Sequence, residues 1–286
     1  ISMVSIILPR AAVAADRIDE VINSQTLILD RDDPVDFAKG KGEICFSHVS
    51  FAYPGAGENA LQDIDFTVEA GCTTAIIGST GCGKSTLVNL IPRLFDVNEG
   101  KITIDGIDIR DVRMKDLRER IGFVPQKGVL FSGTISSNIR FGNDSANDEE
   151  VKRAASIAQA DEFIIEKDKG YEWEIAQGGN NVSGGQRQRL AIARAIAKNP
   201  DIYIFDDCFS ALDYKTDAML RRALKENMGA ATVIIVAQRI STIMHADKII
   251  VLEEGRIVGS GTHDQLMKNN EIYRQIAESQ LSVGDI

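Results

Sequence analysis

Residues 73–91 read TTAIIGSTGCGKSTLVNLI, and the middle of this stretch decides how the rest of the chain is interpreted. The run TTAIIG is typical of a short buried β-strand, and STLVNLI is typical of a helix. Between them, GSTGCGKS matches the spacing G-x-x-x-x-G-K-[ST]. Glycines in such a loop let backbone N–H groups surround a phosphate at the start of a helix. The sequence therefore predicts a phosphate-binding loop, and the flanking strand and helix argue against a chance glycine-rich turn.

The predicted loop carries the groups that a nucleoside triphosphate site requires. Lys84 would reach the β- and γ-phosphates, and Ser85 would ligate Mg²⁺. A further metal ligand is expected at the end of another buried strand, where Asp206 follows the run IYIF. The residues of this stretch that are predicted to contact the nucleotide are Gly78, Ser79, Thr80, Gly81, Cys82, Gly83, Lys84, Ser85 and Thr86.

The pattern of apolar residues on either side of the loop predicts an α/β fold with an antiparallel β layer. The segments EICFSHVSFAY and DIDFTVEAG alternate apolar and polar residues, which is typical of antiparallel strands. Val- and Ile-rich runs separated by helical stretches are typical of buried parallel strands. These runs are 202–207, 232–237 and 248–261. Residues 127–198 contain helical patterns and no good strand, so we expect a helical insertion there.

The N-terminal segment predicts a helix with one apolar stripe, followed by a polar linker. The apolar residues recur at i, i+3, i+4 and i+7 spacing, and Pro9 would bend the helix. They are Val4, Ile7, Leu8, Ala11, Ala15, Ile18 and Ile22. In one interpretation the stripe docks on the chain's own domain. In the other it belongs to a longer protein, because the chain opens without Met.

Composition excludes several classes of protein. Of 286 residues, 32 are Lys or Arg and 42 are Asp or Glu, which gives a formal net charge of −10. Such a chain lacks the broad basic surface of a nucleic-acid binder, so no nucleic-acid partner is predicted. The four cysteines form no CxxC pair, which favours a reduced, cytosolic chain. No stretch approaches the roughly 20 apolar residues that a membrane-spanning helix needs.

The stretch 182–189 reads VSGGQRQR and resembles the signature sequence LSGGQ of ABC proteins. Tyr53, the phosphate-binding loop, Gln126, the signature, the run IYIFDD and the run SALD follow one another in the order of that family. Over residues 43–280, the chain thus resembles the nucleotide-binding domain of an ABC exporter. The resemblance implies a P-loop NTPase core of the ABC ATPase type with an antiparallel β subdomain. It also implies a helical subdomain, at about 127–198, that bears the signature.

The resemblance further implies how the chain is divided and where it works. Residues 1–25 would be the cytoplasmic end of the last helix of a transmembrane domain, 26–42 a linker, and 43–286 the nucleotide-binding domain. The expected partners are the transmembrane domains of the same transporter and a second ABC nucleotide-binding domain. The expected location is the cytoplasmic face of the cell membrane, with membrane association through the transmembrane part.

Family roles transfer to the matching positions, and they imply ATP and Mg²⁺ as ligands. Tyr53 in FAYP would stack on adenine, the alternative being an ordinary strand aromatic. Gln126 in VPQ would meet Mg²⁺ and the attacking water, and would touch the transmembrane coupling helices. A signature engages ATP held by the partner domain, which implies a head-to-tail dimer enclosing two nucleotides. The signature residues expected at the partner's γ-phosphate are Ser183, Gly184, Gly185 and Gln186.

Two positions depart from the family pattern. Asp207 stands where exporter domains that hydrolyse ATP well carry Glu, and the missing methylene withdraws the carboxylate by about 1.5 Å. Positioning of a general base is typically worth about 10²–10⁴ in rate. Gln238 stands where the family has a switch His; it can donate to the γ-phosphate but carries no positive charge. The residues expected to act in hydrolysis are Asp207, Gln238, Gln126 and Lys84.

Together, the two departures predict a site that binds ATP and hydrolyses it slowly, beside an intact signature that serves the partner's site. This combination resembles the degenerate-site subunit of a heterodimeric multidrug-type exporter, so the second domain is expected to be a different subunit. Two alternatives stay open. One is a homodimeric exporter with two slow but active sites, and the other is a non-hydrolysing, ATP-binding regulatory subunit.

Overall fold

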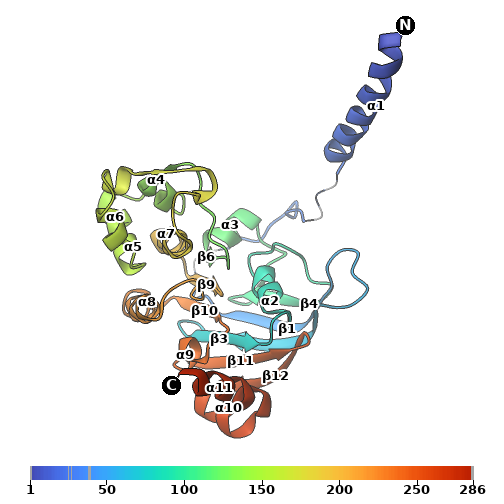
Figure 1. The fold of residues 1–286 in the computed structure, drawn as a ribbon. Helices are drawn as coiled ribbons and strands as arrows, with labels where there is room; N and C mark the ends of the chain where they lie inside the picture. The colour runs from blue at the N-terminus through green and yellow to red at the C-terminus, as the bar shows by residue number, and fades with distance from the viewer. Residues whose placement is uncertain (1, 25, 27, 38–39, 285–286) are drawn as a thin grey trace.

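The computed structural model describes residues 2–24, 26, 28–37 and 40–284. Parts of the predictions for the segments 1–25, 26–42 and 43–286 therefore lie outside the described residues. The positions concerned are 1, 25, 27, 38–39 and 285–286. Figure 1 shows layered β-sheets at the centre, a group of helices beside them, and a long N-terminal helix apart from both.

The largest sheet of the described chain has the strand order β12-β11-β3-β10-β9-β6. Its strands are β3 (Thr73–Gly78), β6 (Ile121–Val124), β9 (Ile202–Asp206), β10 (Thr232–Val236), β11 (Lys248–Glu253) and β12 (Arg256–Gly261). Neighbouring strands pair in parallel, except that β12 pairs antiparallel with β11. Every residue of β9 and β10 is buried, as expected for parallel strands covered on both faces. The predicted α/β fold is therefore confirmed.

Two details of this sheet differ from the prediction. The run 248–261 forms a hairpin of β11 and β12 instead of one strand. It reverses at Glu254 and Gly255, whose φ values of 46° and 74° suit a two-residue hairpin loop. The strand β6 was not predicted, because it is only four residues long and includes Gly122.

The second sheet is antiparallel, with the order β2-β1-β4-β5. Its strands are β1 (Ile44–Phe51), β2 (Leu61–Val68), β4 (Glu99–Ile104) and β5 (Ile107–Asp108). Phe46 of β1 lies opposite Phe66 of β2, and their rings stack with centroids 4.7 Å apart. The predicted antiparallel layer is thus confirmed for β1 and β2. The prediction missed β4, whose first residues, Glu99 and Gly100, interrupt the apolar pattern.

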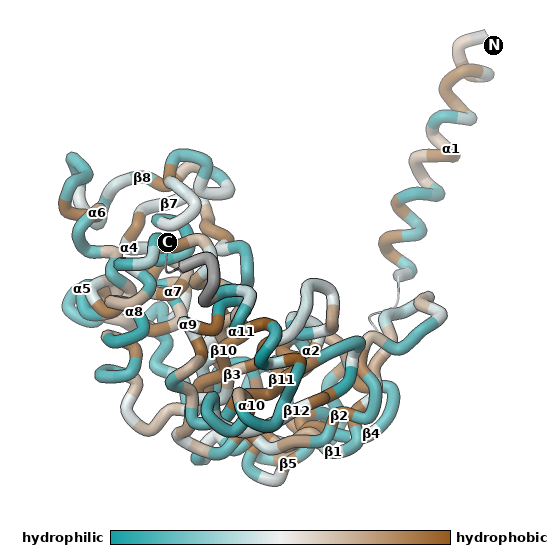
Figure 2. The backbone as a smooth tube through the Cα atoms, turned by 60° about the horizontal axis from the view of Figure 1, so that its bottom comes forward, coloured by the Kyte–Doolittle hydropathy of each residue, from teal (hydrophilic) through white to brown (hydrophobic). Residues whose placement is uncertain are grey.

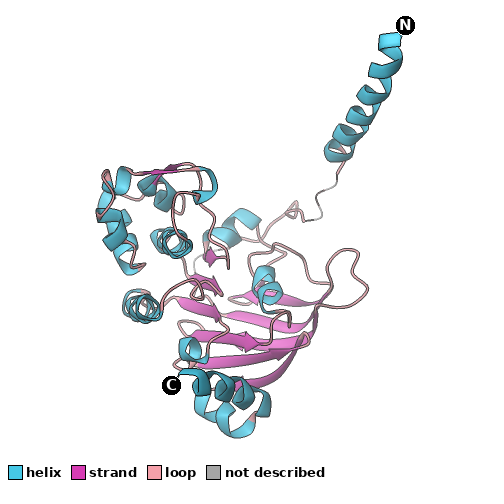
Figure 3. Ribbon diagram, viewed as in Figure 1, coloured by secondary structure: helices cyan, strands magenta, loops and turns pink. Residues whose placement is uncertain are grey.

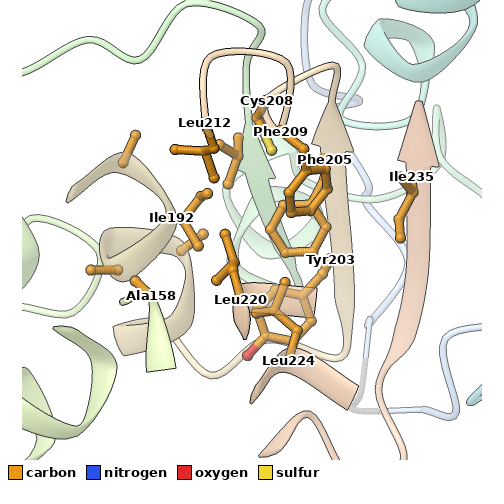
Figure 4. Packing of buried hydrophobic residues seen from close by; sticks show 14 of the residues in the cluster. Ala158, Ile192, Tyr203, Phe205, Cys208, Phe209, Leu212, Leu220, Leu224 and Ile235 are labelled. Carbon is orange, nitrogen blue, oxygen red and sulfur yellow. The ribbon is translucent and has the colours of Figure 1, made fainter. Parts of the chain in front are cut away.

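Side chains along the parallel strands point alternately to the two faces of the sheet, and each face contributes to a separate hydrophobic core. Ile76 of β3 packs toward the antiparallel sheet, while its neighbour Ala75 joins the core on the helical side. Figure 4 shows Tyr203 and Phe205 of β9 in that helical-side core, close to Leu220. In Figure 2 the hydrophobic colour gathers on the central strands. Because both faces of the parallel sheet are covered, the ends of its strands are where a ligand can bind.

Helices surround the sheets in Figure 3. After the N-terminal helix, the α-helices are α2 (Lys84–Leu90), α3 (Met114–Glu119), α4 (Ile135–Arg140), α5 (Asp148–Ile157), α6 (Asp161–Ile165), α7 (Gly184–Ala197), α8 (Tyr214–Asn227), α9 (Ile240–Ile243), α10 (His263–Asn269) and α11 (Glu271–Gly284). Short 3₁₀ helices η1 and η2 span Gly170–Glu172 and Gln177–Gly179. The segment predicted as a helical insertion contains α4 to α7. It also contains a small ladder of β7 (Gly133–Thr134) with β8 (Glu174–Ile175), so the expectation that it lacks strands is wrong.

The N-terminal helix α1 (Ser2–Ile22) continues through Pro9 and stands apart from the sheets (Figure 1). Its apolar side chains are exposed: Val4, Ile7 and Ile18 keep 63%, 56% and 60% of their surface accessible. The interpretation in which the stripe docks on the chain's own domain is therefore wrong. Among the described residues, no helix combines the length and apolar character needed to cross a membrane.

Candidate nucleotide-binding site

Most of the predicted site residues lie where adjacent parallel strands end. β3, β10, β9 and β6 are neighbours in the sheet, and each is followed by a loop that carries predicted site residues. The phosphate-binding sequence begins at the end of β3, and β9 ends at Asp206. Gln238 and Gln126 follow closely after β10 and β6. Ligand sites of open α/β sheets form at this edge of the sheet.

Close packing and backbone conformation shape the loop between β3 and α2. A Cβ at Gly78 would lie 1.9 Å from the carbonyl oxygen of Leu252, so no side chain fits there. Gly83, just before α2, has a φ of 103°, which other residues rarely adopt. Lys84 Nζ donates to the carbonyl oxygens of Gly78 and Ser79 over 2.9 Å and 2.7 Å, so its ammonium lies against the loop. A cation at this point, beside the start of a helix, suits a polyphosphate.

The two predicted metal ligands lie in direct contact. Ser85 Oγ donates to Asp206 Oδ1 over 3.0 Å, although 121 positions separate them in sequence. Burial raises the pKa of Asp206 and the charge of Asp207 adds to the rise, while the Ser85 hydrogen bond and Lys84 oppose it. A hydroxyl and a carboxylate are oxygen ligands of the kind that Mg²⁺ takes beside phosphate oxygens, so the pair fits this ion. Among the described residues there is no cluster of three or more His, Cys, Asp or Glu that could hold a metal ion.

Asp207 is held by two glutamines. Its Oδ2 accepts hydrogen bonds from Gln126 Nε2 over 3.0 Å and from Gln238 Nε2 over 2.6 Å. Its backbone N–H donates to the carbonyl oxygen of Val236 over 2.9 Å, and its φ of 45° lies in the left-handed region that Asp tolerates. Only 6% of the residue is exposed. We call Asp207, Gln126 and Gln238 the amide clamp; it joins three residues that were predicted separately.

The loop of Gln126 is fixed by a residue that the sequence reasoning missed. Gln188 of α7, 2% exposed, donates from Nε2 to the carbonyl oxygen of Pro125 over 3.1 Å. Its Oε1 accepts from the backbone N–H of Gly128 over 3.0 Å, so the carboxamide brackets the loop. Gln126, predicted as a metal ligand, is thereby held with its nitrogen on Asp207 and its Oε1 still available to a ligand. In the sequence Gln188 stands between Arg187 and Arg189, directly after the signature, and nothing in that pattern indicates this contact.

Tyr53 lies beside the loop and on a groove. Its hydroxyl oxygen is 3.0 Å from Thr86 Oγ1, in the first turn of α2. Its ring makes T-shaped contacts with the rings of Phe51 and Phe95, with centroids 4.9 Å and 5.2 Å away. Tyr53 remains 37% exposed, and it lines a groove of 770 Å³ together with Pro54 and Phe95. The ring is therefore fixed by its neighbours and still accessible to a planar ligand.

The signature residues begin helix α7. Ser183 Oγ accepts from the backbone N–H of Gln186, and Gln186 Oε1 accepts from the backbone N–H of Ser183, which forms a capping box. Ser183 and Gly184 are exposed. In Figure 1, α7 lies with the helical group, away from α2 and the phosphate-binding loop. The structure thus brings the signature to the surface and not to the chain's own loop.

Comparisons with known proteins agree with this site. A family model described as "ABC transporter" matches residues 61–210. An uncharacterised ABC transporter ATP-binding protein of Mycobacterium tuberculosis is 46% identical over 283 residues, which cover 98% of this chain and 48% of that protein. A Bacillus subtilis protein, provisionally named a multidrug export ATP-binding/permease protein, is 41% identical over 269 residues, covering 94% of this chain and 46% of that protein.

The solved structure of a bacterial Atm1-family ABC exporter with ATP bound matches with a TM-score of 0.89 and 35% identity. The match covers 96% of this chain and 48% of that chain. The chain therefore spans about half the length of the curated relatives it matches. The region matched to the family model begins in β2 and contains the phosphate-binding loop, Gln126, the signature and Asp206. The chain belongs to the ABC transporter family.

Proposed function

We propose that this chain is the ATP-binding module of an ABC exporter, which closes head to tail with a second nucleotide-binding domain and thereby powers export. Family membership and the names of export-type relatives support this proposal. On this proposal residues 43–286 form the nucleotide-binding domain, 26–42 the linker, and 1–25 the end of a transmembrane-domain helix. The exposed apolar stripe of α1 supports the last assignment, because a transmembrane domain would cover it.

ATP would bind at the carboxyl edge of the parallel sheet. Tyr53 would stack on adenine, because its ring is fixed and accessible and its hydroxyl meets Thr86 beside the loop. Lys84 and the loop amides would bind the β- and γ-phosphates. Ser85 and Asp206, joined by Gln126 Oε1, would hold Mg²⁺, which when bound neutralises charge on the phosphate oxygens.

Hydrolysis at this site would be an in-line displacement. A water oxygen forms a bond to the γ-phosphorus while the bond from that phosphorus to the bridging oxygen breaks. Asp207 would orient the water and accept its proton, and Lys84 would stabilise the charge that leaves with ADP. Gln238 Nε2 carries two hydrogens; one is donated to Asp207, and the second would reach a γ-phosphate oxygen.

The amide clamp is the observation that carries the proposal of a slow site. Oδ2 of Asp207 accepts from both Gln126 and Gln238, so the two glutamines hold the carboxylate in place. A side chain one methylene shorter than Glu cannot keep these bonds and also extend by about 1.5 Å toward the water. We therefore propose that this chain's own site binds ATP and hydrolyses it slowly.

The signature supports a role at a second site. α7 is 14 residues long, and its exposed first turn offers backbone N–H groups to an anion brought by another molecule. A slow site combined with an intact signature is the expected division of labour in one half of a heterodimer. We propose, accordingly, that the second nucleotide-binding domain is a different subunit.

An exposed aromatic pair supports contact with the transmembrane domains. The rings of Phe131 and Phe141 are in contact, tilted by 37° with centroids 4.5 Å apart, and the two residues remain 45% and 63% exposed. Arg194 lies over the Phe131 ring and also donates to the carbonyl oxygen of Val129, close after Gln126. Apolar surface beside the Gln126 loop would receive the cytoplasmic ends of transmembrane helices, and on this proposal the module would work at the cytoplasmic face of the cell membrane.

Steady-state ATPase activity of the chain, measured across protein concentration, tests the proposal. The test compares the native chain with the double variant Asp207→Glu/Gln238→His, in which both departures are reversed. We expect tight ATP binding and near-zero turnover in the native chain, and a gain of about 10²-fold or more in the variant. Asp264→Glu/Gln275→His, which makes the same chemical changes at exposed positions of α10 and α11, serves as the matched control.

The alternatives predict different results. Robust native turnover, with specific activity rising with protein concentration, would favour a homodimer with two active sites and would refute the heterodimer. ATP binding with no turnover in either protein would favour a regulatory subunit. Rescue by the double variant but not by the control supports the degenerate site.

A further inference from the structure

A glutamine of the C-terminal helix holds the loop that carries Gln238. Gln280 of α11 donates from Nε2 to the carbonyl oxygen of Gln238 over 2.7 Å. Its Oε1 accepts from the backbone N–H of Ile240 over 2.8 Å. One carboxamide therefore binds the backbone on both sides of Arg239.

Gln280 provides hydrogen-bond partners for two backbone groups of this loop, the N–H of Ile240 and the carbonyl oxygen of Gln238. Ile240 begins α9, and the residue before it, Arg239, makes no side-chain cap. The N–H of Ile240 is thus one of the first-turn donors that have no partner within the helix. Gln280 supplies the acceptor, and its NH₂ group supplies a donor for Gln238 O at the same time.

Packing of α11 determines where Gln280 lies. Tyr273 and Ala277 are fully buried, and Gln280 follows them on the same helix face at i, i+4 and i+7 spacing. Ile240 and Ile243 of α9, 3% and 0% exposed, belong to the same core. The docked helix therefore places its carboxamide at the Gln238 loop.

Both loops that contribute to the amide clamp are held in this way. Gln188 brackets the loop of Gln126 from α7, and Gln280 brackets the loop of Gln238 from α11. The two loops meet on one oxygen, Asp207 Oδ2. The position of Gln238 Nε2 thus depends on a helix that contributes no group to the nucleotide site.

We propose that Gln280 is a positioning residue that holds Gln238 within reach of the γ-phosphate, so that docking of α11 sets how well this site distinguishes ATP from ADP. The inference rests on the proposed function, because it requires nucleotide at the phosphate-binding loop. Gln238 is the residue that would contact the phosphate, and Gln280 acts only through it.

A comparison of triphosphate and diphosphate affinity tests the proposal. Titrations with ADP and with an ATP analogue carrying a β–γ imido bridge, both with Mg²⁺, give the ratio of the two Kd values. We expect Gln238→Ala to reduce the preference for the triphosphate by about threefold to tenfold, the net worth of one hydrogen bond or slightly more. Gln280→Ala should reduce it by about twofold to fivefold, because the loop is loosened and Gln238 remains.

Three further variants separate positioning from a purely structural role. In the double variant Gln238→Ala/Gln280→Ala, the ratio should equal that of Gln238→Ala alone. Gln280→Glu should lower the ratio as Gln280→Ala does, because its carboxylate can accept from Ile240 but cannot donate to Gln238 O. Gln275→Ala, at an exposed glutamine of the same helix, should leave the ratio unchanged.

The possible failures are distinguishable. If Gln238→Ala lowers the ratio and Gln280→Ala does not, or if Gln280→Ala weakens both nucleotides equally, the inference is overturned and the ATP site stands. If the native chain binds neither nucleotide, the proposed function itself has failed. Additive effects in the double variant would also overturn the inference, because Gln280 would then act independently of Gln238.

Discussion

Replacing Asp207 by alanine is expected to lower the free energy of unfolding by about 3–5 kcal/mol. The carboxylate is 6% exposed and accepts from two amides, and a hydrogen bond to a charged group contributes about 1.5–3 kcal/mol. Its φ of 45° adds about 1 kcal/mol, because alanine adopts the left-handed region less readily than aspartate. Removal of the repulsion between Asp207 and Asp206 offsets part of this sum.

Asp207→Asn provides the informative comparison. Both donors meet the same oxygen, so an asparagine with its Oδ1 in that place still accepts from Gln126 and Gln238. Asparagine also tolerates the left-handed conformation. Only the charge is lost, and relief of the repulsion with Asp206 compensates for part of that loss. We expect a change within about 1.5 kcal/mol.

Urea denaturation at pH 7 without nucleotide measures both values. The single tryptophan, Trp173, reports on the helical segment by fluorescence, and circular dichroism reports on the whole chain. Coincident transitions are required before a free energy is extracted. Asp144→Ala, in an exposed turn, is the matched control and should change the free energy of unfolding by less than about 0.5 kcal/mol.

The reasoning fails if Asp207→Ala is as stable as the native chain, because two hydrogen bonds to a buried carboxylate would then have been lost at no cost. It also fails if Asp207→Asn is as destabilised as Asp207→Ala. That result would mean that charge, and not the shared oxygen, holds Gln126 and Gln238.

Two further predictions concern nucleotide binding and pH. Tyr53→Ala should weaken ATP binding by about 5- to 150-fold, the range measured when an aromatic that stacks on a base is removed. Tyr53→Phe should keep the affinity for ATP within about threefold of the native value. Equal affinity of the native chain and both variants would disprove stacking. Burial raises the pKa of Asp206 above its ordinary value of 3.8, so the folded state binds the proton more tightly than the unfolded state does. The resulting contribution to the free energy of unfolding is fully present below pH 3.8 and is lost as the pH rises through the raised pKa. Asp206→Asn should therefore raise the Tm at pH 7 without nucleotide and remove the dependence of nucleotide binding on Mg²⁺; a lower Tm would contradict the argument.

Much of the fold could be predicted because its signals are local. A strand, a glycine-rich loop and a helix follow one another within residues 73–91, and Val- and Ile-rich runs identify strands wherever both faces are buried. Strands without such runs were missed. β4 begins with Glu99 and Gly100, and β6 is too short to show a period. Their places come from pairing with β1 and β9, which the order of residues along the chain does not reveal.

The candidate site likewise has a part that the sequence predicted and a part that only the structure revealed. The sequence alone determined which residues are candidates: the loop from Gly78 and Asp206 by motif spacing and strand context, and Asp207, Gln126 and Gln238 by the resemblance to ABC exporter domains. Only the tertiary structure decided that Gln126 and Gln238, which lie 81 and 31 positions from Asp207, share one of its oxygens. It also decided that Gln280, 42 positions from Gln238, holds that loop. Hydrogen bonds between distant segments depend on how strands and helices pack, and no local spacing encodes that packing.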